Sequence, residues 1–380
     1  MVFFQKFRSD TNLFQVPFSI PIITMHDDVD IIFFNVFLII ILVNNKSIKI
    51  MYYKTINVPI VLELGEDIFV HLDDILKENH LYFNEKILVT SLELRNLYKS
   101  RLDKLSFEDI LLIKGGSYDE ALEAMNTITN KEVLLVAFGG GSIIDAVKLM
   151  ANTLDLTYIT VPSTLSNDAI YSPIARLLKD GKKQSFGVKA PLGIIADVNI
   201  IKGSPEKLLL AGVGDLVSNA SAVKDWNLAH IDKGESINNF AMALASLSGN
   251  SVIPYTFNDI RSSRFIGDLA NGLVISGLAM VLANSSRPAS GAEHLISHAI
   301  DDLFPNRSTL HGLQVAWGHL LVERDFRKPE NDYEKLMIFF ERMKILDEIE
   351  RDITFSNGEI DQIINRAKTI RNRYTILTKV

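Results

Sequence analysis

The spacing of hydrophobic and polar positions changes about halfway along the chain. In the first half, short apolar runs rich in β-branched residues alternate with segments of helical period. Runs of this kind are typical of parallel strands that are buried on both faces of a sheet. The runs that predict strands are 56–64, 86–91, 109–113, 133–138, 158–161 and 193–196. The segments that predict the intervening helices are 92–105, 118–129 and 142–153.

The strand signals stop at Ser204 and Pro205, which form a good N-cap and first helical residue. We therefore predict an α/β plus all-α architecture, with a doubly wound parallel sheet domain over 51–204 and a helical domain over 205–380. A cleft between two such domains is the usual place for a ligand. The helical patterns of the second half are 206–229, 235–249, 263–284, 289–302, 310–325, 333–349 and 359–373.

The first fifty residues differ in character from the rest. Residues 31–43 form an apolar run interrupted only by Asn35, shorter than the ~20 residues that a helix needs to cross a bilayer. Acidic residues precede the run and no small-residue cleavage site follows it, so it does not match a signal peptide. We interpret 1–50 as an extension outside the fold, translated upstream of a natural start at Met51. A buried strand and a peripheral membrane contact are the alternatives.

Composition narrows the functional class. Of the 380 residues, 47% are hydrophobic and 22% are charged, which is typical of a globular protein with a large core. The net charge is −7 without a basic block, so we expect no nucleic-acid partner. Cysteine is absent, which excludes disulfides and thiolate metal sites and fits a reducing cytoplasm. Any metal must therefore be held by His, Asp or Glu.

A glycine-rich turn follows the strand predicted at 133–138. Gly139, Gly140 and Gly141 lead directly into the next predicted helix. Glycines at such a turn let the backbone approach a diphosphate, and the helix N-terminus presents free N–H groups to the anion. The pattern is not G-x-G-x-x-G, and a plain tight turn is the alternative. Because the turn lies at the mouth of a parallel sheet, we favour a dinucleotide phosphate site.

A second polar loop, 161–169, follows the next predicted strand. The carboxyl ends of neighbouring parallel strands converge, so this loop should face the same ligand as the glycine turn. Its hydroxyl groups and the Asp168 carboxylate suit phosphate, ribose or polyol oxygens. The alternative is a loop in which Asp168 only caps a helix.

Histidines cluster in the helical half. His294 and His298 are four residues apart on one predicted helix face, and His311 opens the next helix. Two imidazoles need one more anionic ligand to form a zinc site with an open position. Asp215 is the best candidate, because its helix is core-facing and an unpaired buried carboxylate would be costly. Ordinary hydrogen-bonded histidines are the alternative.

Taken together, these motifs resemble the iron-containing alcohol dehydrogenase and dehydroquinate synthase-like superfamily. Their order and spacing are most similar to its archaeal sn-glycerol-1-phosphate dehydrogenase branch, over roughly residues 55–380. That branch makes the glycerol phosphate backbone of ether phospholipids. The matching stretches are GGGSIIDAVK at 139–148, VPSTLSNDA at 161–169, Gly214–Asp215, RPASGAEHLISH at 287–298 and His311–Gly312.

The resemblance implies roles residue by residue. Asp215, His294 and His311 match the zinc ligands, so the metal belongs to the helical domain. Asp168, Asp215 and His298 match substrate-binding and catalytic positions, with His298 relaying protons. Ser142 stands where many members carry a basic residue, which leaves the choice between NADH and NADPH open. Cofactor contacts are implied for Gly139, Gly140, Gly141, Ser142, Ile143, Ile144, Asp145, Ser163, Thr164, Leu165, Ser166 and Ser172.

The implied activity is the zinc-assisted, NAD(P)H-dependent reduction of dihydroxyacetone phosphate to sn-glycerol 1-phosphate. The resemblance also implies a cytoplasmic homo-oligomer without stable membrane insertion. Lys189 and Arg287 are our candidates for holding the substrate phosphate. The alternatives are a glycerol or polyol dehydrogenase of the same superfamily, a lyase-type member that recycles its bound NAD, and a non-catalytic nucleotide-binding protein.

Overall fold

The chain forms two compact units, Met1–Asn57 and Val58–Val380. The computed structural model describes 22–24, 29–34, 37–44, 47–50 and 58–379, without 131 and 330. The described strands of the first unit pair antiparallel in the order β1-β2-β3-β4. They are β1 (Ile22–Thr24), β2 (Val29–Phe34), β3 (Phe37–Asn44) and β4 (Ser47–Ile50). The start at Met51 lies outside the described residues and stays a prediction.

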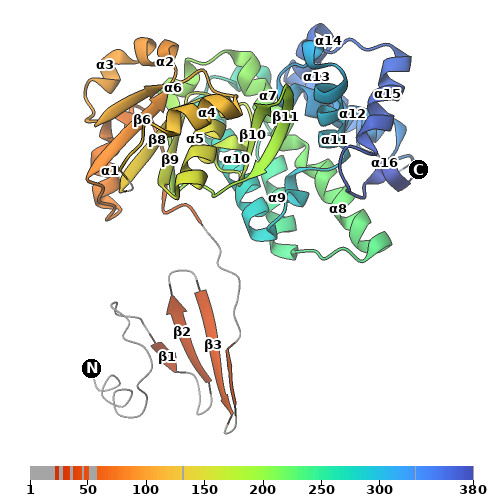
Figure 1. Ribbon diagram of the computed structural model, residues 1–380. Helices are drawn as coiled ribbons and strands as arrows, with labels where there is room; N and C mark the ends of the chain where they lie inside the picture. Colours follow the sequence, from red (N-terminus) through yellow and green to blue (C-terminus); the bar gives the residue numbers. More distant parts are fainter. Residues whose placement is uncertain are drawn as a thin grey trace. The chain divides into compact units, whose positions relative to one another are not determined.

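The second unit is built on a six-stranded sheet of order β5-β12-β9-β8-β6-β7, in which every neighbouring pair is parallel (Figure 1). Each of the predicted strands is present, so the parallel α/β prediction is confirmed. The strands are β5 (Val61–Gly65), β6 (Glu85–Thr90), β7 (Asp109–Leu112), β8 (Val133–Gly139), β9 (Thr157–Pro162) and β12 (Gly193–Asp197).

Strand β8 shows why the apolar runs lack alternation. Leu134 and Val136 belong to one hydrophobic core, whereas Val133 and Leu135 belong to a second core. Helices α1 and α3 contribute to the first of these cores, and α4 and α5 contribute to the other. The helices of this half are α1 (Leu72–Glu78), α2 (Leu92–Leu97), α3 (Lys99–Leu102), α4 (Tyr118–Met125), α5 (Gly141–Leu154) and α6 (Val198–Lys202).

The single helix predicted at 92–105 is wrong, because α2 and α3 are separated at Tyr98. The backbone of Tyr98 has φ −106° and ψ 20°, outside the helical range. Its ring packs edge-on against Phe138 with centroids 5.5 Å apart, and its hydroxyl donates to the Ile200 carbonyl at 3.3 Å. The break lets this aromatic side chain reach the core under the sheet.

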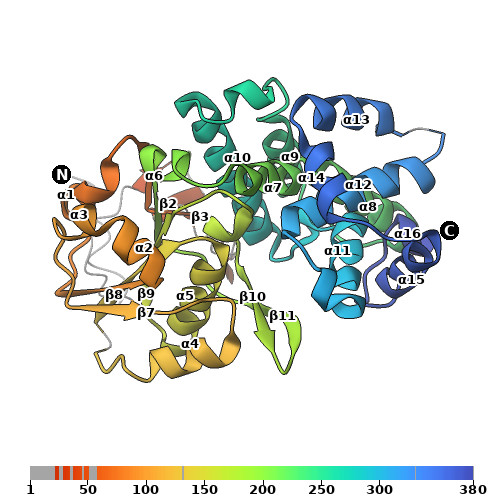
Figure 2. The ribbon, with the colours of Figure 1, turned by 90° about the horizontal axis from the view of Figure 1, so that it is seen from above.

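A hairpin that the sequence pattern did not predict follows the second polar loop. It consists of β10 (Ile174–Lys179) and β11 (Lys182–Gly187), joined by Asp180 and Gly181. Both loop residues have positive φ, 52° and 74°, as a two-residue type I′ hairpin turn requires. The hairpin lies where the sheet half meets the helical half (Figures 1 and 2).

Helices alone follow α6. The pattern predicted as one helix at 206–229 is divided at Ser218, whose hydroxyl donates to the Asp215 carbonyl at 2.6 Å. The predicted division into two domains near 204 stays a prediction, because 58–380 pack as one compact unit. The helices are α7 (Glu206–Val217), α8 (Asn219–Lys233), α9 (Asn239–Asn250), α10 (Ser263–Ala283), α11 (Ala292–Leu303), α12 (His311–Asp325), α13 (Tyr333–Arg342), α14 (Ile345–Asp352), α15 (Asn357–Ala367) and α16 (Ile376–Lys379).

Helix α10 is the one described helix that is long and apolar enough to cross a membrane. It has 21 residues and an apolar window of mean hydropathy 1.8. However, 72% of that window is buried inside the protein. Helix α10 is therefore a core helix, packed mainly against α9.

Candidate metal and cofactor site

Three helices bring the predicted metal ligands together. Asp215 lies on α7, His294 on α11 and His311 on α12. The Asp215 Oδ1 atom is 3.5 Å from His294 Nε2 and 3.7 Å from His311 Nε2. One ligand atom from each residue lies within 4.8 Å of the others. A carboxylate and two imidazoles in this arrangement can hold a divalent cation and leave a coordination position open.

Glycines permit the helix packing that places these ligands. A Cβ atom on Gly312 of α12 would lie 1.9 Å from the Ala211 carbonyl oxygen of α7. A Cβ atom on Gly212 of α7 would lie 1.9 Å from the Leu165 carbonyl oxygen in the second polar loop. Side chains at either position would push the backbones apart. Gly312 therefore lets His311 approach Asp215, and Gly212 brings the polar loop to the same place.

The electrostatics of the Asp215 carboxylate favour a cation beside it. Its Oδ1 atom is buried and has no hydrogen-bond partner, and its Oδ2 atom accepts the Asp168 backbone N–H at 3.1 Å. Burial opposes the charged form, yet His294 and His311 hold the pKa of Asp215 below its usual value. Burial also opposes a charged His294, but Asp215 and Glu293 raise its pKa to about 9. A proton on His294 and a divalent cation are alternative ways to compensate this carboxylate.

The Nδ1 atoms of His294 and His311 contact neighbouring polar side chains. His294 Nδ1 lies 3.0 Å from Glu293 Oε1, and His311 Nδ1 lies 3.1 Å from the Ser297 hydroxyl. These contacts orient each Nε2 atom toward Asp215. A carboxylate behind a ligating imidazole raises the basicity of the ring and fixes its tautomer.

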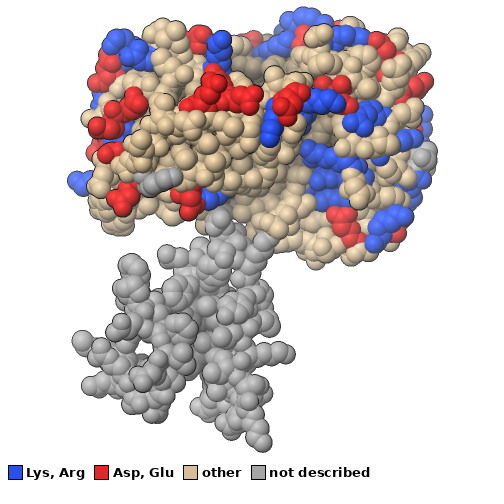
Figure 3. Space-filling view, in the orientation of Figure 1, with Lys and Arg blue, Asp and Glu red and all other residues tan. Residues whose placement is uncertain are grey.

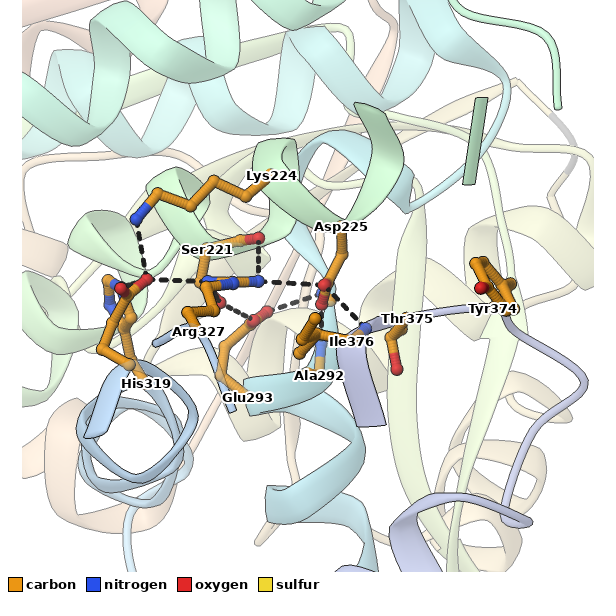
Figure 4. Close-up of polar contacts among 12 residues, drawn as sticks. Ser221, Lys224, Asp225, Ala292, Glu293, His319, Arg327, Tyr374, Thr375 and Ile376 are labelled. Carbon is orange, nitrogen blue, oxygen red and sulfur yellow. Dashed lines mark hydrogen bonds and ion pairs between the residues drawn. The ribbon is translucent and has the colours of Figure 1, made fainter. Parts of the chain in front are cut away.

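Glu293 is part of a larger buried cluster of charges, the Glu293 network (Figure 4). Its side chain accepts hydrogen bonds from the Ser221 hydroxyl and the Gly291 N–H, both at 2.6 Å. Arg327 bridges Asp225 at 2.9 Å and Glu323 at 2.8 Å, and it also donates to Ser221. The network ties α8, α11 and α12 together behind the ligands. Its members are Ser221, Lys224, Asp225, Glu293, His319, Glu323 and Arg327.

A cavity of about 500 Å³ opens beside the metal ligands. Residues of the glycine turn, the polar loop and the histidine cluster share its wall. The predicted site residues that line it are Gly141, Ser142, Asp145, Asp168, Ser172, His294, His298 and His311. The predicted site residues that do not line it are Gly139, Gly140, Ile143, Ile144, Ser163, Thr164, Leu165, Ser166 and Asp215. The ligand contacts of all these residues stay predictions.

The glycine turn packs against a second pair of glycines that the sequence reasoning missed. Gly115 and Gly116 follow β7 and have φ of 80° and 78°. The Gly116 N–H donates to the Ser142 carbonyl at 3.0 Å, and a Cβ atom on Gly115 would lie 2.8 Å from the Ser142 backbone. Both glycines line the cavity. Their signal in the sequence was a Gly-Gly pair directly after a strand.

A buried lysine joins the predicted cofactor elements. Lys148 on α5 is fully buried, with its Nζ atom 3.1 Å from Asp145 Oδ1. It also donates to the Ser172 hydroxyl at 3.1 Å and to the Ile174 carbonyl at 2.8 Å. Asp145 in turn accepts the backbone N–H of Arg176 at 3.0 Å. The helix after the glycine turn is thereby fixed to the loop before β10 and to β10 itself.

His298 lies beside the predicted metal ligands. Its ring centroid is 6.4 Å from that of His294 and 6.0 Å from that of His311. Its Nδ1 atom is buried and has no hydrogen-bond partner. Burial, followed by the charges of Arg176 and Arg371, holds the pKa of His298 well below its usual value. The neutral ring therefore lines the cavity and keeps one buried hydrogen-bonding atom unused.

Neither candidate for the substrate phosphate reaches the cavity. Lys189 pairs with Asp155 at the surface. Arg287 is buried, pairs with Glu235 and donates to the Tyr374 carbonyl at 2.8 Å. Its charge is therefore used within the helical half, and a phosphate-binding role of either residue stays a prediction. The cationic side chains that do line the cavity are Arg176, Lys183 and Arg371.

Comparisons with known proteins agree with this arrangement. A family model described as iron-containing alcohol dehydrogenase matches residues 65–205. A glycerol-1-phosphate dehydrogenase [NAD(P)+] of Thermococcus sibiricus is 37% identical over 287 residues, 72% of this chain and 79% of that protein. A protein of the same name from Archaeoglobus fulgidus is 33% identical over 339 residues, 87% of this chain and 95% of that protein.

Solved structures share the fold. The glycerol dehydrogenase of Schizosaccharomyces pombe superposes with a TM-score of 0.69 at 18% identity, covering 86% of both chains. A probable glycerol dehydrogenase of Sinorhizobium meliloti superposes with a TM-score of 0.67 at 17% identity, covering 84% of this chain and 91% of that one. At such low identity the likeness concerns the fold alone.

Proposed function

Since this chain belongs to the glycerol-1-phosphate dehydrogenase family of the iron-containing alcohol dehydrogenases, a family of oxidoreductases, we propose that it reduces dihydroxyacetone phosphate to sn-glycerol 1-phosphate with NADH or NADPH. The observation that carries the proposal is the unpartnered Oδ1 atom of Asp215. This atom lies between two imidazoles, and the helices that carry those imidazoles, α11 and α12, border a cavity shared with the glycine turn. The donor set fits zinc, which accepts nitrogen and carboxylate ligands.

The chain's own residues would bind and orient the two reactants. The turn before α5 would hold the cofactor diphosphate, because the N-terminus of this 14-residue helix faces the cavity through Gly141 and Ser142. Zinc on Asp215, His294 and His311 would supply a Lewis acid, and the nicotinamide would supply the hydride. The network behind His294 would keep the ligand geometry fixed during turnover.

Asp168 and His298 would serve the substrate's oxygens. Asp168 lines the cavity, and burial together with the nearby Asp215 raises its pKa to about 7. Near neutral pH it can thus donate or accept a hydrogen bond to the substrate hydroxyl. His298 lies next to the ligands, with one ring nitrogen free to relay a proton between the cavity and the reacting oxygen.

We also propose a role in making the backbone of archaeal ether phospholipids, in the cytoplasm, by a homo-oligomer. The support comes from relatives named for glycerol 1-phosphate, all from archaea in the comparisons above. The runner-up is a glycerol or polyol dehydrogenase, the name carried by structural neighbours. That function would need no anion-binding wall beside the metal, whereas three cationic side chains line this cavity.

The test is an assay of NADH and NADPH oxidation by the purified full chain with dihydroxyacetone phosphate, after chelation and then with added zinc. We expect oxidation that depends on zinc, consumes one NAD(P)H per product and gives the 1-phosphate configuration. Activity only on glycerol or dihydroxyacetone would move the function to the polyol branch. Turnover without net NADH consumption would indicate the lyase type.

A further inference from the structure

Arg371 carries a charge that no described carboxylate compensates. It follows α15 and lines the cavity beside the histidine cluster. Its guanidinium donates to the Ser185 hydroxyl at 2.9 Å, and no carboxylate of 58–379, leaving out the undescribed residue 330, forms an ion pair with it. Burial, followed by the charge of Arg176, lowers the pKa of Arg371. Burial and the nearby positive charge of Arg176 both oppose the charged form of this guanidinium. An anion bound to its free N–H groups would compensate that charge.

Two further cations lie beside Arg371 and share one carboxylate. Asp301 accepts from Arg176 at 2.8 Å and from Lys183 at 3.1 Å. Arg176 also donates to the Ser185 hydroxyl at 3.2 Å, so this one oxygen bridges both guanidiniums. Three positive side chains thus face a single carboxylate and a neutral hydroxyl. The net positive charge of these side chains is about equal and opposite to the charge of a phosphate dianion.

The excess of positive charge extends into an adjoining cavity of about 570 Å³. Five cationic side chains line that cavity, against the two carboxylates of Asp301 and Asp302. Figure 3 shows Lys and Arg side chains gathered on the helical half near the place of the β10–β11 hairpin. His298 lines both cavities, so the cationic side chains of the two cavities lie next to the predicted metal ligands.

We propose that Arg371, Arg176 and Lys183 form the subsite that binds the phosphate of the substrate, and that Arg371 is its specificity-determining residue. The inference rests on the proposed function and deepens it. In dihydroxyacetone phosphate only a methylene group and an ester oxygen separate the carbonyl carbon from phosphorus. A substrate whose carbonyl lies at the metal ligands must therefore place its phosphate close to His298. A planar guanidinium can bind two phosphate oxygens at once.

The cofactor is a second source of phosphate groups, and the geometry favours the substrate. The adjoining cavity is lined by the cationic residues and His298, and none of residues 115–117 or 139–145 of the glycine turns lines it. A cofactor diphosphate held at α5 would lie in the first cavity, which Gly141 and Ser142 line. The kinetic test separates the two sources, because each affects a different Michaelis constant.

The test compares R371Q with R371K and with a matched control, R324Q. Arg324 is half-exposed on α12 and pairs with the adjacent Asp325, so its substitution removes the same charge away from the cavity. Zinc-loaded full-length proteins are assayed with dihydroxyacetone phosphate and with dihydroxyacetone, and inorganic phosphate binding is measured by calorimetry. In R371Q the ratio of the two kcat/KM values should fall about 100-fold, and phosphate binding should weaken at least tenfold.

R371K should lose about tenfold in the same ratio, because it keeps the charge but not the planar fork. R324Q should match the wild type. If the wild type reduces dihydroxyacetone phosphate and R371Q keeps the full ratio, the subsite is wrong and the proposed function stands. A higher KM for NADH or NADPH in R371Q, with the ratio intact, would overturn the proposal in favour of the cofactor. A wild type inactive on the phosphorylated substrate would instead contradict the proposed function itself.

Discussion

Two clusters of buried charge lie on neighbouring helices and differ in how completely their carboxylates are paired. In the Glu293 network the Asp225 carboxylate accepts from Arg327 and from the backbone of Ala292 and Ile376. Glu323 similarly accepts from Lys224, Arg327 and the Asp332 N–H. In the histidine cluster, by contrast, Asp215 Oδ1 and His298 Nδ1 are buried without a hydrogen-bond partner.

The difference separates charges that hold the fold from charges that await a ligand. A buried ion that is fully paired contributes to a specific arrangement, and removing one partner strands the other. A buried polar atom without a partner costs free energy that folding alone does not recover. Asp215 and His298, whose unpaired atoms are named above, are both predicted ligand-binding residues. Substitutions of the predicted metal ligands should therefore reduce zinc binding and activity more than stability. Substitutions in the Glu293 network should reduce stability more than zinc binding.

The largest effect should follow the loss of a metal ligand. H294A should lose bound zinc and reduce kcat/KM by at least about 10³-fold, because the Lewis acid would be worth several kcal/mol in the transition state. The metal-free protein should remain folded, with a free energy of unfolding within about 2 kcal/mol of the wild type. Metal analysis, the NADH assay and urea unfolding measure these quantities. H230A, at an exposed histidine of α8, is the control, and normal activity in H294A would contradict the assignment.

In the Glu293 network, a substitution should reduce the stability of the fold more than it reduces zinc binding. R327M should destabilise the protein by about 3 kcal/mol, because it leaves Asp225 and Glu323 buried without their shared cation. Zinc content per folded molecule should change much less. R324M, at an exposed arginine of the same helical half, is the control for loss of an arginine. A loss below about 1 kcal/mol in urea unfolding would mean that the network does not stabilise the fold.

A smaller effect should appear where the two clusters meet. E293Q should weaken zinc binding about 10–100-fold, because Glu293 orients His294 and raises its basicity through the Nδ1 contact. Competition with a fluorescent chelator measures the affinity. Saturating zinc should recover most of the turnover, which distinguishes a positioning residue from a ligand. If zinc affinity is unchanged, the two clusters act independently.

The smallest effect should follow S221A. Its hydroxyl donates to Glu293 at 2.6 Å and accepts from Arg327 at 2.9 Å, so it joins the carboxylate behind His294 to the cation of the network. We expect a loss of about 1–2 kcal/mol in stability and only a few-fold loss in zinc affinity. Urea unfolding and the chelator competition on the same sample measure both. A larger loss of zinc affinity in S221A than in E293Q would contradict the expectation that Glu293 has the stronger effect on the zinc site.

Much of the fold was predictable because the parallel strands are buried on both faces. Strand β8, for example, begins at the predicted residue and ends one residue later than predicted. Strand β11 carries mostly exposed polar residues, so neither hydrophobic runs nor alternation marked it. The turn Asp180–Gly181 was the available signal, since an Asp-Gly pair favours a hairpin.

The site was predictable only where motifs carried it. Asp215, His294 and His311 were identified from ligand chemistry and from the family resemblance, and the structure brings them together. The sequence did not predict the cationic residues of the cavity wall, because Arg176 lies on the unpredicted hairpin and Arg371 follows the last long helix. Arg287 was a reasonable candidate by type, but only the folded chain shows that Glu235 already compensates it.

The most direct test of the account is a crystal structure of the full chain grown with zinc and sn-glycerol 1-phosphate, with anomalous data at the zinc edge. We expect one strong peak about 2.0–2.2 Å from Asp215 Oδ1, His294 Nε2 and His311 Nε2. The substrate phosphate should lie against Arg371. A zinc peak elsewhere, or none at these residues, would contradict the claim that Asp215, His294 and His311 form a metal site.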